Sequence, residues 1–414
     1  MPKPDIVVGL DVGSAQVVAV LAQRDPETDA LQVLGGARRA CRGLKGGVVI
    51  NIDETAQAVA RAVEEAEGLA DLVGATKSLL IGIRGAHLQT FNHHGAMNIA
   101  RTDKEITPED RDQVVENTKA VPISPDREIV HVIPQDFILD RQSGVPNPVG
   151  MEASLLEVDV HIVTASQSHL NNVWKAIAKA GFQVEEPIYG LLAVGDAVVS
   201  PEEKDLGCVL LDLGGQTTGI AVYAEGAVRF TKELVLGADA VTHDLSHALR
   251  TSLVEAQKIK ERDGAASRSL ADGNLEETLE YLSVDGRTTK RIKRQGLVDF
   301  ISPRIEELFT VVQEELRNSG FGDRVAGGGV ILTGGGSLLK GMAGAAEQIL
   351  ELPVRHGLPQ GLAGRADILG HPSYATALGL LHYRHLGEWA RSRRAKPQGG
   401  RLVSRIKSLI EEFF

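Results

Sequence analysis

The stretch Ile6-Val7-Val8-Gly9-Leu10-Asp11-Val12-Gly13-Ser14 places an aspartate and a glycine turn directly after an apolar strand. In the second half of the chain, Val209-Leu210-Leu211-Asp212-Leu213-Gly214-Gly215-Gln216-Thr217-Thr218 repeats this pattern. A strand-end carboxylate, beside glycines that let backbone N–H groups approach closely, suits the Mg²⁺ and the phosphates of a nucleotide. The repeat therefore predicts a duplicated α/β domain that closes on one nucleotide from both sides.

Length, charge and cysteine content limit the class of protein. The 414 residues suffice for two or more domains, and the net charge of −11 argues against nucleic-acid binding. The two cysteines, Cys41 and Cys208, form neither a disulfide framework nor a metal set, so we expect a reducing cytoplasm. No stretch reaches the roughly eighteen uninterrupted apolar residues of a membrane-spanning helix, so the body of the protein is expected to be soluble.

Strand and helix patterns alternate along the chain, which predicts α/β architecture with mixed or parallel sheets. Expected strands cover 5–22 with a turn inside, 47–52, 79–83, 129–140, 155–164 and 329–333. Expected helices cover 54–67, 107–119, 169–180, 239–262, 297–317 and 374–385, with a polar stretch at 263–295. The helix at 54–67 is expected to start after Asp53, and the one at 107–119 has Thr107 as its cap.

A third glycine motif ends the strand at 329–333. It reads Thr333-Gly334-Gly335-Gly336-Ser337, and three glycines permit a close backbone approach to a flat base or an α-phosphate. The chain has neither a Walker loop nor a Rossmann glycine fingerprint. Asp11 alone would suit an ordinary hairpin turn, but its repetition at Asp212 favours the phosphate interpretation.

The three motifs, in this order, resemble the actin–Hsp70–sugar kinase superfamily. The resemblance implies two phosphate motifs, an adenosine motif, and connecting helices that carry Gly190, Ala193 and Gly195 and, later, Ala375 and Gly379. It also matches Glu255 and Lys258 to the pair that clasps the adenosine, although the pair alone would be a surface salt bridge. The nucleotide-binding residues so implied are Gly13, Ser14, Ala15, Gln16, Gly214, Gly215, Gln216, Thr217, Glu255, Lys258, Gly334, Gly335, Gly336 and Ser337. The implied catalytic carboxylates are Asp11, Asp212 and Glu186, of which Asp11 and Asp212 would hold Mg²⁺, through water.

Within the superfamily the chain resembles the bacterial cell-division family FtsA over nearly its whole length. The stretches that carry the resemblance are 43–49, 127–135, 147–151 and 156–164. In FtsA the section containing the last three is an inserted subdomain, 1C, of the SHS2 type, which contacts the next subunit of a filament. The implied organisation is subdomain 1A at 1–85 and 166–205, 1C at 86–165, 2A at 206–240 and 321–390, 2B at 241–320, a basic linker at 391–400 and an amphipathic helix at 401–414.

Three positions depart from the family pattern. Gln16 stands where a lysine is usual, Gln216 where a third glycine is usual, and Gly219 where an aspartate is common. Loss of a cation beside the phosphates weakens charge stabilisation of phosphoryl transfer. The sequence therefore predicts ATP binding with slow or negligible hydrolysis.

The last fourteen residues form an amphipathic pattern. Apolar residues recur at helical spacing beside three basic ones: Leu402, Val403, Ile406, Leu409, Ile410, Phe413 and Phe414, with Arg401, Arg405 and Lys407. Such a helix could dock on a protein groove. The basic, flexible tether at 391–400 favours an interfacial anchor on an anionic membrane, which the resemblance also implies.

A basic edge beside an apolar helix face occupies the region that the resemblance assigns to 2B, the receptor of the FtsZ C-terminal peptide. The residues predicted to bind FtsZ are Arg291, Lys293, Arg294, Phe300 and Arg304. A solvated charge run is the alternative interpretation.

Together these features predict an ATP-binding, polymerising peripheral membrane protein that tethers FtsZ to the cytoplasmic face of the inner membrane at the division septum. Its expected partners are FtsZ, further copies of itself, the anionic membrane and other divisome proteins, but no nucleic acid. Two alternatives stay open: a superfamily kinase of a small sugar or carboxylic acid, and a relative of the pilus-assembly protein PilM.

Overall fold

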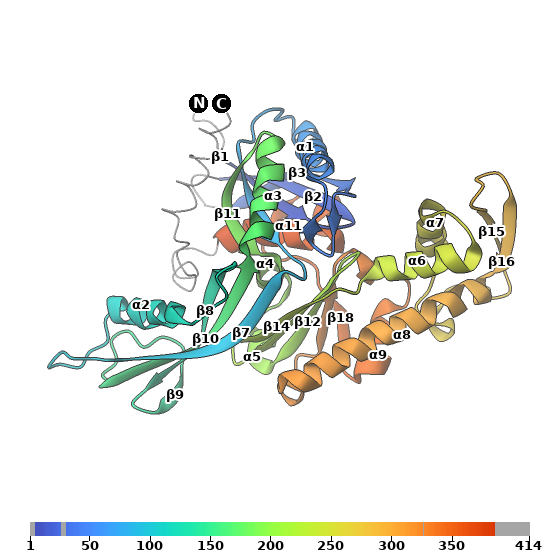
Figure 1. Cartoon of the computed structure of the whole chain (residues 1–414). Coiled ribbons are helices and arrows are strands. Elements are labelled where there is room, and N and C mark those ends of the chain that lie inside the picture. The colour runs from blue at the N-terminus through green and yellow to red at the C-terminus, as the bar shows by residue number, and fades with distance from the viewer. Residues whose placement is uncertain (1–4, 26–29, 326, 386–414) are drawn as a thin grey trace. The chain divides into compact units, whose positions relative to one another are not determined.

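The computed structural model describes residues 5–25, 30–325 and 327–385 (Figure 1). The chain forms two compact units. One combines the residues up to Thr90 with Ala165–His385, and the other is built from Phe91–Thr164. The predicted linker at 391–400 and the predicted helix at 401–414 lie outside the described residues.

The first unit contains a six-stranded and a five-stranded sheet, and five strands of the first follow the same order as those of the second. The first has the order β11(Gln183–Tyr189), β6(Ser78–Ile83), β1(Asp5–Val12), β2(Gln16–Arg24), β3(Leu31–Ala40) and β19(Ala363–Gly364). The second has the order β18(Val354–His356), β17(Val330–Thr333), β12(Cys208–Leu213), β13(Thr218–Ala224) and β14(Ala227–Leu234). In each, an antiparallel meander follows the aspartate motif strand, and a parallel strand lies on its other side.

The register repeats as well. Asp11 is paired with Val18 on β2 and with Gly82 on β6. Asp212 is paired with Gly219 on β13 and with Thr333 on β17. The two aspartates therefore occupy equivalent strand ends, and the predicted duplication of an α/β domain is confirmed.

Helices cover both sheets. In the first lobe, α1(Ile52–Leu69) packs on β2 and β3 and contacts α3(Gln167–Lys179), while α4(Gly190–Val198) and α11(Ala375–His385) pack together, with α11 against β1. In the second lobe, α6(Ala238–Leu249), α7(Leu253–Asp263), α8(Arg294–Ser319) and α9(Met342–Leu350) accompany the hairpin β15(Thr278–Leu282)–β16(Thr289–Lys293). The short helices are α5(Pro201–Leu206) and α10(Ala366–Leu369).

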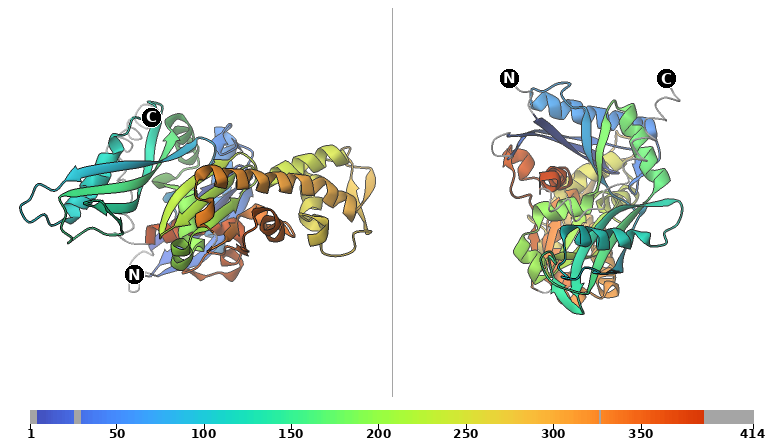
Figure 2. Two further views of the ribbon diagram at one scale, coloured as in Figure 1. Left: turned by 90° about the horizontal axis from the view of Figure 1, so that it is seen from below. Right: turned by 90° about the vertical axis from the view of Figure 1, so that its left-hand side faces the viewer.

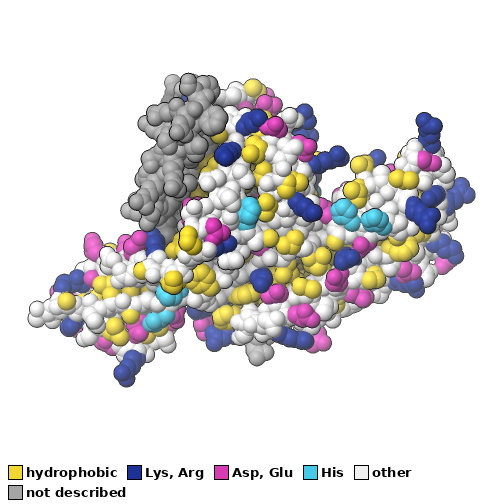
Figure 3. All heavy atoms as spheres, viewed as in Figure 1, with side chains coloured by type: hydrophobic (Ala, Val, Ile, Leu, Met, Phe, Trp, Pro, Cys, Tyr) yellow, Lys and Arg dark blue, Asp and Glu magenta, His cyan; other side chains and the backbone are white. Residues whose placement is uncertain are grey.

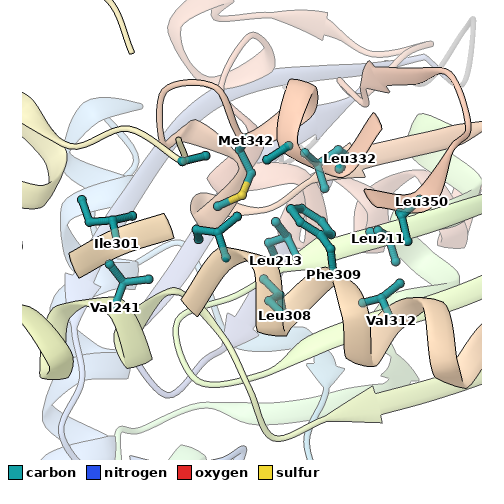
Figure 4. Packing of buried hydrophobic residues seen from close by; sticks show 14 of the residues in the cluster. Leu211, Leu213, Val241, Ile301, Leu308, Phe309, Val312, Leu332, Met342 and Leu350 are labelled. Atoms are coloured by element: carbon teal, nitrogen blue, oxygen red, sulfur yellow. The ribbon is translucent and has the colours of Figure 1, made fainter. Parts of the chain in front are cut away.

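The long helix α8 lies along the second sheet (Figure 2). Its buried side chains recur at helical spacing and include Ile301, Ile305, Leu308, Phe309 and Val312. They pack with Leu211, Leu213 and Leu332 from the sheet in one continuous core (Figure 4). This core fixes the strand ends from which the second and third glycine motifs start.

The second unit has a sheet and core of its own. Its sheet has the order β7(Leu88–Asn98), β10(Leu155–Ser166), β8(Arg127–Leu139) and β9(Gln142–Val145). Helix α2(Pro108–Asn117) begins with a capping box between Thr107 and Asp110, as the sequence indicates. Val114 from this helix joins Leu156, Val158 and Ile162 in the core.

Several predicted boundaries were wrong for local reasons. The expected strand at 47–52 is a tight hairpin, β4(Leu44–Lys45) and β5(Val48–Val49), because Gly46 and Gly47 adopt φ values of +57° and +81°. Helix α1 begins at Ile52 with Asn51, not Asp53, as its cap. The expected helix at 239–262 is two helices, since Arg250 has φ +50° and Ser252 caps a new start.

The connecting helices α4 and α11 approach too closely for a side chain at Gly379. A Cβ there would overlap the carbonyl oxygen of Ala193. We therefore expect Gly379→Ala to destabilise the protein by about 1–3 kcal/mol through overpacking.

The matched control is Gly68→Ala, in the last turn of α1, where an added Cβ meets nothing within 4 Å. That change should stabilise the helix by about 0.5–1 kcal/mol. Scanning calorimetry of both variants measures the difference. Equal unfolding temperatures would contradict the close approach of α4 and α11.

Candidate functional site

The turns of the two phosphate motifs have the same geometry. The Gly13 N–H donates to the Gln16 carbonyl at 3.1 Å, and the Gly214 N–H donates to the Thr217 carbonyl at 2.9 Å. A Cβ on either glycine would lie 2.8 Å from that same oxygen. Both turns therefore need glycine for the same reason, and both follow an aspartate at the end of a core strand.

The two turns lie against each other. A Cβ on Gly215 would come within 2.5 Å of the Ala15 Cβ, and the Gly46 N–H donates to Gln216 Oε1 at 2.9 Å. Ser14 Oγ accepts from the Gly47 N–H at 2.8 Å, which ties the first turn to the β4–β5 hairpin. The structure thus brings together the residues predicted at Gly13–Gln16 and Gly214–Thr217.

The third glycine motif adjoins the second. Gly334 has φ +82°, and a Cβ there would overlap Asp212 Oδ1 and lie 2.5 Å from the Leu213 carbonyl oxygen. The next residues, Gly335–Leu338, form a 3₁₀ turn in which the buried Ser337 hydroxyl donates to the Gly334 carbonyl at 2.7 Å. The motif predicted to contact the adenosine therefore packs directly on the aspartate of the second phosphate motif.

A small apolar pocket lies beside this turn. Gly336 lines it together with Leu213, Val241, Leu308 and Met342. Arg304, which the sequence assigns to FtsZ binding, also lines this pocket. Its guanidinium pairs with Asp244 at 2.7 Å and with Glu307.

A buried charge cluster joins the two lobes, and sequence reasoning missed two of its members. Arg84, directly after β6, donates to Asp212 and, from Nε at 2.7 Å, to Glu233 on β14. Burial lowers the pKa of Arg84, but Glu233 and Asp212 outweigh this and hold it well above its usual value. A signal was available: carboxyl ends of parallel strands meet at one edge, so a residue after the strand at 79–83 had to lie near Asp11.

Asp11 itself lies in an unfavourable environment for a carboxylate. Burial raises its pKa to about 7, with Arg84 opposing the shift and the negative charges of Asp212 and Glu233 adding to it. Burial also raises the pKa of Glu233, and Arg84 opposes that shift. The cluster holds three acidic groups against one arginine.

The predicted adenosine pair lies on α7, and the predicted third catalytic carboxylate lies on β11. Glu255 Oε1 accepts from the Leu282 N–H at 3.2 Å, and Lys258 is exposed on α7. On the same helix the buried Lys260 donates to the Ala238 carbonyl at 3.1 Å and to Thr242 Oγ1 at 2.9 Å. Glu186 lies on β11, and its side chain is outside the described part of the structure.

The predicted FtsZ region carries basic side chains over the β15–β16 hairpin (Figure 3). Three of the predicted cations each have an acidic neighbour: Arg291 pairs with Glu280 at 2.8 Å, Lys293 with Glu276 at 2.6 Å, and Arg294 with Glu277 at 2.6 Å. Arg294 is nearly buried and also donates to the Asp263 carbonyl, whereas Phe300 is 43% exposed. Arg291, Lys293 and Phe300 are thus the accessible members of the set.

Neither a metal cluster nor a membrane-crossing helix is found in the described ranges. Within residues 5–25, 30–325 and 327–385, no three His, Cys, Asp or Glu side chains are placed to hold an ion. Over the same part of the chain, no helix combines the length and apolarity needed to cross a bilayer. The predicted Mg²⁺ position at Asp11 and Asp212 does not fit this arrangement, because Arg84 occupies the Asp212 carboxylate.

The raised pKa of Asp11 makes folding stability depend on pH. Between the unfolded value near 4 and the folded value of about 7, the folded state binds more protons, so stability falls as pH rises. We expect Asp11→Asn to remove this loss. Its stability advantage over the natural chain should grow across that window by at most about 1.4 kcal/mol per pH unit and then level off.

Urea unfolding of both proteins at about pH 5 and pH 8 measures this advantage. The same difference at the two pH values would show that Asp11 titrates normally.

Comparison with known proteins places this geometry in a family. Residues 209–379 match the family model for cell division protein FtsA, and residues 85–164 match the SHS2 domain inserted in FtsA. The chain is 39% identical to cell division protein FtsA of Pseudomonas aeruginosa over 91% of its own length and 89% of that protein.

Two solved structures share the fold. They are the PilM–PilN type IV pilus biogenesis complex, with TM-score 0.66 and 17% identity over 92% of this chain and 98% of that one, and MreB 5 of Spiroplasma citri bound to AMPPNP, with TM-score 0.52 and 13% identity over the whole of both chains. The predicted actin-like fold with an SHS2 insertion is therefore confirmed. The chain has two lobes that repeat one sheet, an inserted SHS2 unit, and a sequence similar to that of a relative along almost its full length. It therefore belongs to the FtsA family of cell division proteins.

Proposed function

We propose that this protein binds an adenine nucleotide between its two lobes, polymerises, and tethers FtsZ to the inner membrane at the division septum. The observation that carries the proposal is the contact between two equivalent glycine turns, at Ala15 and Gly215, in a member of a cell-division family. Each turn presents backbone N–H groups after a strand-end aspartate, and together they would enclose a polyphosphate from both sides.

The same turns argue for binding with little turnover. Gln16 supplies no positive charge to the first turn, and the Gln216 side chain is engaged by the Gly46 N–H at 2.9 Å. Stabilisation of charge that develops during phosphoryl transfer needs fixed cations or donors aimed at the reacting oxygens. A bound nucleotide would then act mainly by holding the lobes together.

Assembly would multiply a weak membrane attachment. The predicted tail helix carries seven apolar side chains beside Arg401, Arg405 and Lys407. Each cation near an anionic leaflet contributes on the order of 1 kcal/mol, and an interfacial helix buries its apolar face only in part. One anchor should therefore bind reversibly, and a filament with many anchors should bind firmly.

The inserted unit is the proposed filament contact. It has its own sheet and core between Phe91 and Thr164, so it is a rigid body of the kind that a neighbouring subunit requires. The finer division into subdomains 1A, 1C, 2A and 2B at the predicted boundaries is part of the same proposal.

Electron microscopy on anionic lipid monolayers tests the dependence on nucleotide, the formation of filaments and the binding to the membrane in one experiment. The full chain with ATP should form membrane-bound filaments. A chain ending at Ala390 should leave the monolayer bare, because it lacks the tail, while keeping its affinity for ATP. Equal decoration of the monolayer by both proteins would contradict the membrane anchor. Filaments that form equally well without ATP would contradict the role of the nucleotide in assembly.

The FtsZ contact is tested on the accessible part of the basic edge. Arg291→Glu reverses a charge on the basic edge that is predicted to contact the peptide, and it breaks only an exposed ion pair, so the fold should persist. We expect at least about fivefold weaker binding of an FtsZ C-terminal peptide, measured by fluorescence anisotropy.

The matched control is Arg39→Glu, which breaks an exposed pair with Glu65 in the first lobe. Arg294→Glu is unsuitable, since it would leave the buried Asp263 and the exposed Glu277 beside a third carboxylate. Unchanged peptide binding by Arg291→Glu would move the FtsZ site elsewhere.

A further inference from the structure

The guanidinium of Arg84 lies between carboxylates that come from two different strands of the opposite lobe. It donates to Asp212 at the end of β12 and to both oxygens of Glu233 on β14, at 2.7 Å from Nε and 3.4 Å from Nη2. The exposed fractions of the three side chains are 10% for Arg84, 7% for Asp212 and 2% for Glu233. These charges therefore depend on one another for compensation, because water reaches them poorly.

The fold reserves space for this side chain. A Cβ on Gly190, at the start of α4, would lie 2.8 Å from Arg84 Cδ. A Cβ on Gly219 would overlap Arg84 Nη2 and lie 2.9 Å from Leu191 Cδ1. Glycines on two separate elements thus leave room for the arginine side chain. This indicates that the fold is shaped to hold the guanidinium at this position.

A divalent metal ion and this guanidinium would compete for the same oxygens. Hard cations such as Mg²⁺ take carboxylate oxygens as ligands, and they need them free. In this chain the Asp212 carboxylate is paired with Arg84 and its other oxygen, Oδ1, faces the backbone at Gly334. A covalently attached cation also competes at a fixed, high local concentration.

We propose that Arg84 is the resident cation of this charge cluster, holding the position beside Asp212 and Glu233 that a divalent metal ion would otherwise take. The inference rests on the proposed function in one respect: adenine nucleotide should then bind without a divalent metal requirement. Its other consequence, the exclusion of a metal from the free protein, is independent of any nucleotide.

Direct metal binding by the full chain tests the proposal, with Mn²⁺ as the probe and electron paramagnetic resonance as the readout. The natural chain should bind no Mn²⁺ at this cluster up to about 1 mM. Arg84→Ser frees the oxygens of the two carboxylates Asp212 and Glu233, and should gain one Mn²⁺ per chain with at least about tenfold higher affinity. Arg84→Lys, which keeps a cation there, should resemble the natural chain.

A second route to the same test keeps Arg84 in the chain. Gly219→Ala should push the flexible end of the arginine away from Asp212 and should also gain Mn²⁺. The control is Arg294→Ser, which removes an equally buried arginine but leaves Asp263 paired with Arg262 at 2.6 Å. It should gain none. A tight Mn²⁺ in the natural chain, no gain in either Arg84→Ser or Gly219→Ala, or an equal gain in the control would overturn the proposal.

Calorimetric titration of the natural chain with ATP, in Mg²⁺ and in EDTA, distinguishes failure of the Arg84 proposal from failure of nucleotide binding itself. Affinities within about threefold of each other support the role of Arg84, and a loss of more than about tenfold in EDTA contradicts it. If ATP binds under neither condition, nucleotide binding itself fails, and the Mn²⁺ measurements still decide whether Arg84 is the resident cation.

Discussion

The compensation of buried negative charge at the meeting point of the two lobes is the constraint on which this structure depends. Duplication of the sheet places Asp11 and Asp212 at equivalent strand ends, and Glu233 adds a third acidic group. Carboxylates that water reaches poorly cannot stay ionised together without a counter-charge. Arg84, from the same lobe as Asp11, supplies that charge to Asp212 and Glu233 of the opposite lobe, and partial protonation of Asp11 near pH 7 relieves the remainder.

Close backbone packing supports this arrangement. Gly379 lies directly on the Ala193 carbonyl between α4 and α11, and a Cβ on Gly9 would overlap the carbonyl of Ala377. Gly215 similarly admits Ala15. Contacts of this kind allow little movement, because a close-packed protein interior is destabilised by the addition of a single methyl group. The position of Asp11 at the end of β1 is therefore fixed by the packing of α11 behind that strand.

Much of the fold was predictable, because its signals are local. The repeated apolar strand, aspartate and glycine turn indicated both sheets, whereas the pair of connecting helices that carry Gly190 and Gly379 was implied by the resemblance to the superfamily. The hairpin at Leu44–Val49 was mistaken for a strand because the positive φ of Gly46 and Gly47 is invisible in apolar periodicity. Arg250 broke a helix for a similar reason. Local backbone geometry decided these cases.

The charge cluster was less predictable. Asp11 and Asp212 belong to motifs, whereas Arg84 and Glu233 acquire their meaning only when strands distant in sequence are placed side by side. The acidic partners of Lys293 and Arg294 were also hidden, since Glu276 and Glu277 lie on the far side of the hairpin in sequence. The pairing of distant segments depends on the topology of the fold. It cannot be predicted from the pattern of residue types along one segment.

The way the chain enters and leaves the inserted unit has an evolutionary consequence. It departs along β7 and returns along β10, and these strands are hydrogen-bonded neighbours in one sheet. The entry and exit points therefore lie side by side, and the cost of closing the loop between them varies only slowly with the length of what is inserted. A lineage could exchange this whole module without rebuilding either lobe.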